Sequence, residues 1–102
     1  MPQKDFQIWL NENIYLVVDY ETNAGRVVGF VVRLMIDLDG STYNVARYDT
    51  AHGTPHRDVL TRSSNIIEKY WLVNMDFDYA LAYAIDDFKK NHECYIANWR
   101  AH

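Results

Sequence analysis

The sequence of 102 residues has a single cysteine, Cys94, which excludes an internal disulfide and a zinc site built from several cysteines. No apolar run is long enough to span a membrane, because Arg33 and Asp37 interrupt the longest one. The first residues, MPQKDFQIWLNEN, have neither the basic region nor the long apolar run of a signal peptide. We therefore expect a protein of the reducing cytoplasm that does not enter a membrane.

The chain also lacks an excess of positive charge, and its formal net charge is −4. This excludes a general DNA-coating role, which needs many lysines and arginines to displace counterions. Only four glycines are present and they are scattered, so no glycine-rich loop is available to cradle a phosphate. Repeats, low-complexity segments and Ser/Gly linkers are absent, which predicts one domain over residues 1–102.

Alternating apolar residues predict an antiparallel sheet of about four or five strands in a meander. The expected strands cover residues 6–10, 14–20, 26–38, 41–49 and 56–61. Residues 65–73 fit either a short helix or another strand. Asp76 resembles an N-cap, and apolar residues at a spacing of three to four predict a helix over 77–96. The fold class is therefore α+β, with the sheet packed against one long C-terminal helix.

Asp39-Gly40 is a strong signal for a two-residue hairpin turn between the strands 26–38 and 41–49. This turn sets a register in which directly opposed residues share a face. The expected opposed pairs are Ile36 with Tyr43, Leu34 with Val45, Val32 with Arg47, and Phe30 with Asp49. Arg47 and Asp49 would then lie on the apolar face, where charges must be paired or must open onto a cleft.

The segment RYDTAHGTPHRDVL, residues 47–60, concentrates residues suited to acid–base chemistry on a phosphoester. A ribonuclease that works without a metal needs one group to deprotonate the 2′-hydroxyl and another to protonate the leaving oxygen. His52 and His56 are candidates for this catalytic pair, since an imidazole titrates near neutral pH. Asp49 or Asp58 is a candidate to orient an imidazole.

The same segment holds candidates for binding the ligand. Arg47 or Arg57 can donate two parallel hydrogen bonds to phosphate oxygens. Tyr48 can stack on a base or donate its hydroxyl. These residues predict RNA or a nucleotide as the binding partner, with no cofactor.

Two other interpretations of the segment stay open. In the first, Arg47 and Asp49 pair with Arg57 and Asp58 in a structural salt-bridge corner. In the second, the histidines bind a metal. Their spacing of four suits a helical zinc pair, but Gly53 and Pro55 make a helix unlikely there. A third ligand from Asp49, Asp58 or His92 would be needed, so no metal site is expected.

The sequence also supports a non-catalytic interaction module as the alternative function. Aromatic residues make up 15% of the chain, and Tyr and Trp are enriched in protein interfaces. Tyr79 and Tyr83 form an i, i+4 pair on the expected helix, and Trp99 lies beyond its expected end. A homodimer or a partner complex through this aromatic C-terminal helix would use them.

The run RYDTAHGTPHRD, after a DG hairpin and before a single C-terminal helix, resembles the histidine-bearing segment of TumE-like toxin components of prokaryotic toxin–antitoxin pairs. The resemblance covers about a fifth of the chain and maps onto Arg47, Tyr48, Asp49, His52, Pro55 and His56. It implies either a small cytoplasmic toxin component acting on RNA or a related small prokaryotic domain with no toxin role. The chain departs from that family in having HGTPHRD in place of a denser run of histidines.

Overall fold

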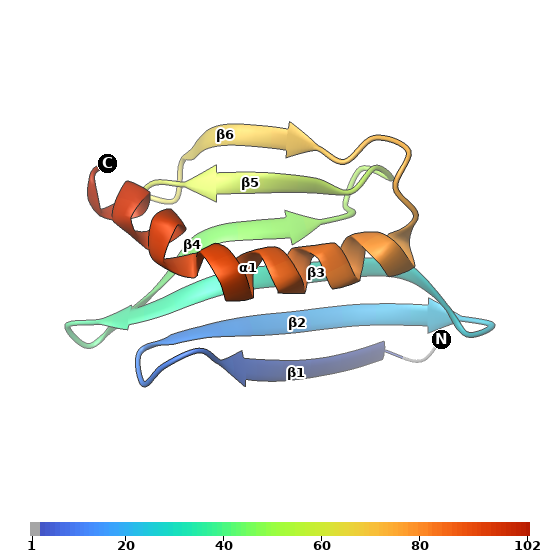
Figure 1. The fold of residues 1–102 in the computed structure, drawn as a ribbon, viewed down its shortest axis with the longest axis horizontal. Helices are drawn as coiled ribbons and strands as arrows, with labels where there is room; N and C mark the ends of the chain where they lie inside the picture. The colour runs from blue at the N-terminus through green and yellow to red at the C-terminus, as the bar shows by residue number, and fades with distance from the viewer. Residues whose placement is uncertain (1–2) are drawn as a thin grey trace.

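The computed structural model describes residues 3–102 as a six-stranded antiparallel sheet with one long helix across one face (Figure 1). The strands follow one another in the sheet in chain order, as a meander. They are β1 (Gln3–Trp9), β2 (Ile14–Asn23), β3 (Arg26–Leu38), β4 (Ser41–Asp49), β5 (His56–Leu60) and β6 (Ile66–Trp71), and the helix is α1 (Phe77–Arg100). The α+β class is confirmed, with one strand more than the sequence predicted.

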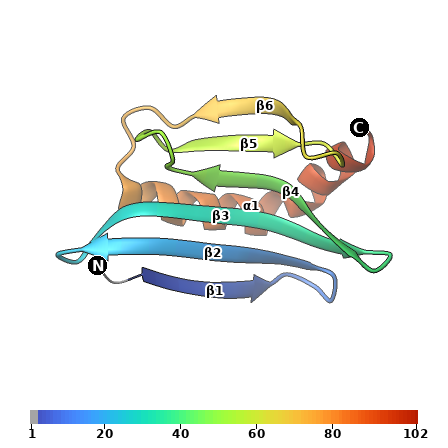
Figure 2. The same cartoon turned by 180° about the vertical axis from the view of Figure 1, so that it is seen from behind.

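The extra strand is the segment that fitted either a helix or a strand. Its residues 66–71 pair with β5 and form one edge of the sheet, which Figure 2 shows opposite the β1 edge. All six side chains of β6 are exposed, so no apolar face marks the segment as a strand. Backbone pairing with β5 decides its conformation, and this pairing cannot be predicted from the residues of the segment itself.

Two tight turns shape the sheet, and the sequence predicts the one at Asp39-Gly40. Asp39 and Gly40 have φ of 52° and 80°, as the hairpin between β3 and β4 requires. Ala24 and Gly25 have φ of 52° and 79° in the turn between β2 and β3. Glycine adopts left-handed backbone freely and aspartate tolerates it, whereas the side chain of Ala24 disfavours it.

Helix α1 begins where the sequence predicts, and it ends later. The side chain of Asp76 accepts a hydrogen bond from the backbone N–H of Tyr79 at 2.8 Å and so caps the helix. The expected apolar stripe continues past residue 96 through buried Trp99, which holds the last turns on the sheet. The helix packs mainly on β3 and β4, as Figure 1 shows.

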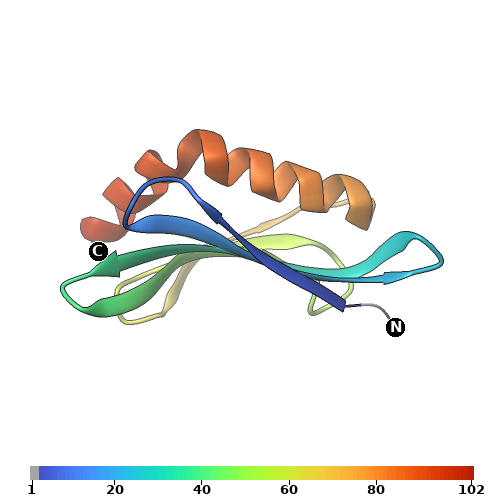
Figure 3. The ribbon, with the colours of Figure 1, turned by 90° about the horizontal axis from the view of Figure 1, so that it is seen from below.

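The hydrophobic core lies between α1 and one face of the sheet. Its buried members include Leu16, Val18, Phe30, Val32, Leu34, Ile36, Tyr48, Ala84, Phe88 and Trp99. Figure 3 shows the helix on one side of the sheet only. We call the other side, which no helix or strand of residues 3–102 covers, the open face. No helix of the described residues is long and apolar enough to cross a membrane.

The register of the β3–β4 hairpin follows the prediction only near the turn. Ile36 is opposite Tyr43, as expected. The register then shifts between Leu34 and Met35, and Val45 becomes the extra residue of a β-bulge. Val45 has no partner residue on β3, but its side chain is fully buried and contributes to the core.

The bulge overturns the prediction for the end of the hairpin. Val32 is opposite Tyr48 instead of Arg47, and Val31 instead of Phe30 is opposite Asp49. One extra residue moves every later side chain to the other face of the sheet. The prediction that Arg47 and Asp49 lie on the apolar face is therefore wrong: both lie on the open face, and Tyr48 enters the core.

Candidate functional site

The pairing of β4 with β5 places acidic, basic and imidazole groups side by side on the open face. Asp49 is directly opposite His56, and Arg47 is directly opposite Asp58. Directly opposed residues share a face, so these four side chains lie together. We call Arg47, Asp49, His56 and Asp58, with Lys69 from the neighbouring β6, the open-face cluster.

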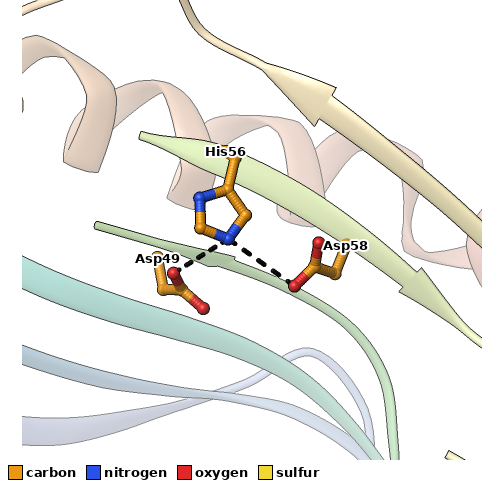
Figure 4. A group of neighbouring side chains, drawn as sticks. All are labelled: Asp49, His56 and Asp58. Carbon is orange, nitrogen blue, oxygen red and sulfur yellow. Dashed lines mark ion pairs between the residues drawn. The ribbon is translucent and has the colours of Figure 1, made fainter. Parts of the chain in front are cut away.

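His56 lies between the two carboxylates of the cluster, with its ring directed toward Asp49 and Asp58, as Figure 4 shows. Its Nε2 is 3.0 Å from Asp49 Oδ1 and 3.6 Å from Asp58 Oδ2, while its Nδ1 is 3.2 Å from the carbonyl oxygen of Thr54. Both ring nitrogens thus face oxygen atoms that can accept a hydrogen bond. The side chain is only 2% exposed, so these contacts hold the imidazole in one orientation.

Two cations balance the carboxylates of the cluster. Arg47 Nε lies 3.1 Å from Asp58 Oδ2 and 3.6 Å from Asp49 Oδ2, and Lys69 Nζ lies 2.8 Å from Asp58 Oδ1. Burial raises the pKa of Asp58, but the Lys69 ammonium and the Arg47 guanidinium outweigh it and hold that pKa below its ordinary value. Asp58 is therefore a paired carboxylate, as a buried charge must be.

The loop between β4 and β5 brings a second histidine above the first. A turn in which Gly53 N–H donates to the Thr50 carbonyl at 3.0 Å folds the loop back, with Gly53 at a φ of 85°. The exposed ring of His52 then stacks on His56, with centroids 6.0 Å apart and an angle of 24° between the rings. Trp71 packs on His56 from β6, at a centroid distance of 4.9 Å.

The two remaining candidates lie on the other face, under α1. Tyr48 donates its hydroxyl hydrogen to Asp87 at 2.7 Å, and it is completely buried. Arg57 donates to the Tyr95 hydroxyl and to Glu68, each at 2.9 Å. Burial and the bond to Asp87 raise the pKa of Tyr48. Neither side chain can therefore act on the same ligand as Arg47 or His52.

The structure thus divides the seven residues singled out from the sequence. Five come together on the open face, Arg47, Asp49, His52, His56 and Asp58, and Tyr48 and Arg57 do not join them. Sequence reasoning missed Lys69 and Trp71 because residues 65–73 had no assigned strand and so no assigned neighbours. A prediction that residues 65–73 pair with β5 as a β-hairpin would have placed both residues beside the cluster.

The cluster also contains the donor atoms of a metal site. Ligand atoms of Asp49, His56 and Asp58 all lie within 4.8 Å of one another. However, Arg47 and Lys69 already neutralise the two carboxylates, and a metal ion would have to compete with both cations. His92, the third ligand considered from the sequence, lies on α1 across the sheet. The charge balance thus favours an ion-paired cluster over a metal centre.

Comparison with known proteins gives one match. The whole chain, residues 1–102, matches the family model described as "Domain of unknown function (DUF7718)". No curated protein and no solved structure matches the chain.

Proposed function

The chain belongs to the DUF7718 family, whose function is unknown, and we propose from the open-face cluster that it binds single-stranded RNA and cleaves it without a metal ion. The observation that carries the proposal is the histidine stack: an exposed imidazole is held above a buried one that two carboxylates and a backbone carbonyl fix in place. Acid–base catalysis needs a ring that the ligand can reach, and the stack gives the accessible ring of His52 a neighbour that is fixed in place.

His52 is the residue of the pair that can touch a ligand. It is exposed on the loop, whereas His56 is 2% exposed beneath it. We therefore assign the proton transfer to His52 and make His56 and Asp49 its positioning residues. His52 takes the proton of the 2′-hydroxyl, whose oxygen bonds to the phosphorus as the bond to the 5′-oxygen breaks and a cyclic phosphate forms. The leaving 5′-oxygen takes a proton from water, and the hydroxide that remains takes the proton back from His52.

Arg47, Lys69 and Trp71 supply the binding surface around the histidines. The side chains of Arg47 and Lys69 are 34% and 32% exposed, so each can contact a phosphate oxygen at the edge of the cluster. Trp71 is 43% exposed on the same face and offers its ring to a base. Basic groups beside an exposed aromatic ring are the usual means of binding single-stranded RNA.

Two further points support this ligand and this compartment. The segment RYDTAHGTPHRD resembles the histidine-bearing segment of TumE-like toxin components, which supports RNA as the substrate class and a toxin role. Cys94 is exposed and free, which fits a reducing compartment, so we place the activity in the cytoplasm.

The test is cleavage of a short single-stranded RNA in the presence of EDTA, followed together with the NMR signals of the histidine rings. We expect the wild type to cleave and the His52 ring signals to shift when RNA is added. His52→Ala should lower the rate by a factor of about 100 or more, the usual contribution of an acid–base group. Its melting temperature should change little, because His52 is exposed.

His92→Ala is the matched control, since this histidine lies on α1 across the sheet and should leave cleavage unchanged. Cleavage that EDTA abolishes would replace our mechanism with metal catalysis at Asp49, His56 and Asp58. Absence of both cleavage and ring shifts would reduce the open-face cluster to a structural salt-bridge corner.

A further inference from the structure

Strand β6 is an edge strand whose exposed side chains are largely apolar. In the sequence IIEKYW, four of the six residues are aliphatic or aromatic, and Tyr70 and Trp71 are 52% and 43% exposed. The opposite edge strand, β1, has the sequence QKDFQIW, with charged or amide side chains at four of its seven positions. Polar side chains protect an edge strand from pairing, and β6 has fewer of them.

The backbone of β6 offers free hydrogen-bonding groups at defined residues. The N–H of Leu72 donates to the carbonyl of Pro55 at 2.8 Å, so the backbone of Leu72 points toward β5. Backbone groups of alternate residues point in opposite directions across a strand. Those of Lys69 and Trp71 therefore point off the edge of the sheet, ready for another strand.

We propose that β6 pairs antiparallel with β6 of a second copy of this chain, with the two-fold axis at Tyr70. In this register the outward groups of Lys69 meet those of the partner copy's Trp71, and each such pair exchanges both backbone hydrogen bonds. Centring the axis on Lys69 instead would place two ammonium groups directly opposite each other, which is destabilising. Charge therefore favours the register centred on Tyr70 over the one centred on Lys69.

The side chains are self-complementary in this register. Lys69 already lies over the ring of its own Trp71, with Nζ 5.4 Å from the centroid, and dimerisation gives it a second tryptophan ring across the strands. The two Tyr70 rings meet at the axis on the other face, beside the Arg57 guanidinium that lies 5.2 Å from the Tyr70 centroid. The result is an isologous dimer with a continuous sheet.

This dimer differs from one built through the aromatic helix, and it also extends the open face. Both copies keep the same face toward the same side, because a two-fold axis perpendicular to a sheet does not invert it. The partner copy's Trp71 lies next to Lys69, at the edge of the open-face cluster. The inference concerns the edge strand and stands independently of the proposed RNA cleavage.

The first test is the mass in solution by analytical ultracentrifugation over a range of concentrations. We expect a dimer for the wild type and a monomer for Tyr70→Glu, because this change sets two carboxylates opposite each other at the axis. Within one chain the new carboxylate lies near the Arg57 guanidinium, so the fold should survive. Circular dichroism and thermal melting check that it does.

Tyr79→Glu is the matched control, as Tyr79 is 61% exposed on α1 and takes no part in the edge pairing. It should leave the dimer intact. A wild type that is monomeric at every concentration, or a folded Tyr70→Glu variant that remains dimeric, would overturn the proposal. Loss of the dimer in Tyr79→Glu would assign the interface to the helix instead.

A second test fixes the register. Tyr70→Cys in a Cys94→Ser background should form a disulfide-linked dimer under mild oxidation, because the Cα atoms of such a central pair lie about 4.5 Å apart. Glu68→Cys in the same background should remain unlinked, since this residue is opposite position 72 in the proposed register. Efficient linking at position 68 and none at position 70 would refute the register centred on Tyr70.

Discussion

The two faces of the β4–β5 pair carry similar chemistry and differ in what covers them. On one face Tyr48 and Arg57 meet carboxylates and a second tyrosine beneath α1. On the other, beneath a short loop, His56 meets two carboxylates, Asp49 and Asp58, which Arg47 and Lys69 neutralise. Both faces are rich in polar groups that satisfy one another, yet within residues 47–60 only the open face leaves a histidine exposed. The strand alternation thus decides which polar residues can meet a ligand.

This difference has a consequence for stability. On the face beneath α1, polar groups are surrounded by hydrophobic packing that excludes water whether or not they are paired. On the open face no helix does this, and Asp58 is nevertheless only 1% exposed because Arg47, Lys69 and His56 surround it. The open-face cluster should therefore contribute to folding as well as to function, and Asp58 is where the contribution is most concentrated.

The largest expected effect is that of Asp58→Ala. It leaves Arg47 and Lys69 without their shared carboxylate, which should destabilise the fold by about 3 kcal/mol, the low end for a broken buried pair, because both cations are partly exposed. Urea denaturation measures the loss. Asp19→Ala is the control: its pair with Arg33 at 3.1 Å is partly exposed on both sides and should contribute less than about 1 kcal/mol.

Equal losses in these two variants would show that the open-face cluster is no better shielded from water than an ordinary surface ion pair. The only remaining difference between the two faces would then be that α1 covers one of them.

Most of the fold could be predicted from the sequence, since its elements follow from local patterns. The alternation in residues 26–38 predicts a strand, Asp39-Gly40 predicts a hairpin turn, and Asp76 predicts the start of a helix. Each of these predictions is confirmed. Strand β6 could not be assigned from the sequence. Its side chains are exposed on both faces, so no alternation of buried and exposed residues marks it as a strand. Its place depends on pairing with β5, a non-local interaction.

The candidate site could be predicted only in part, for a reason located at one residue. Without a bulge, the hairpin turn places Arg47 and Asp49 beneath the helix; the bulge at Val45 reverses this. Nothing in STYNVARYD marks Val45 as the extra residue, since a buried valine fits a regular strand equally well. The reversal brings Tyr48 to the core, where its ring packs on Phe88 at 5.0 Å between centroids.

A smaller effect is expected on the covered face, from Tyr48→Phe. The change removes the hydrogen bond to Asp87 and keeps the ring, so it should cost about 1.5 kcal/mol. Asp87 keeps its bonds from Tyr95 and Asn91, which limits the loss. Tyr83→Phe is the control, since Tyr83 is 38% exposed and should change stability by less than about 0.5 kcal/mol.

A loss in Tyr48→Phe as large as that in Asp58→Ala would mean that the covered face depends on its polar network as strongly as the open face does. Urea denaturation of both variants under one condition gives this comparison directly.

The smallest expected effect is a difference between the two faces in how their contribution to the free energy of unfolding depends on pH. The cations around Asp58 hold its pKa in the folded protein below the ordinary value of 3.8, so its ionised form stabilises the fold above that pH. This contribution is lost as pH falls through the lowered pKa, where the folded protein takes up the proton that the unfolded chain has already bound. The difference in unfolding free energy between wild type and Asp58→Asn should thus be greatest near neutral pH and shrink below about pH 3.8. Tyr48→Phe should keep its difference wherever the Asp87 carboxylate that accepts its bond stays ionised, because the pKa of Tyr48 is raised and its hydroxyl stays protonated. A difference for Asp58→Asn that does not change with pH would mean that this carboxylate contributes through packing, and the two faces would then be alike in how they hold their polar groups.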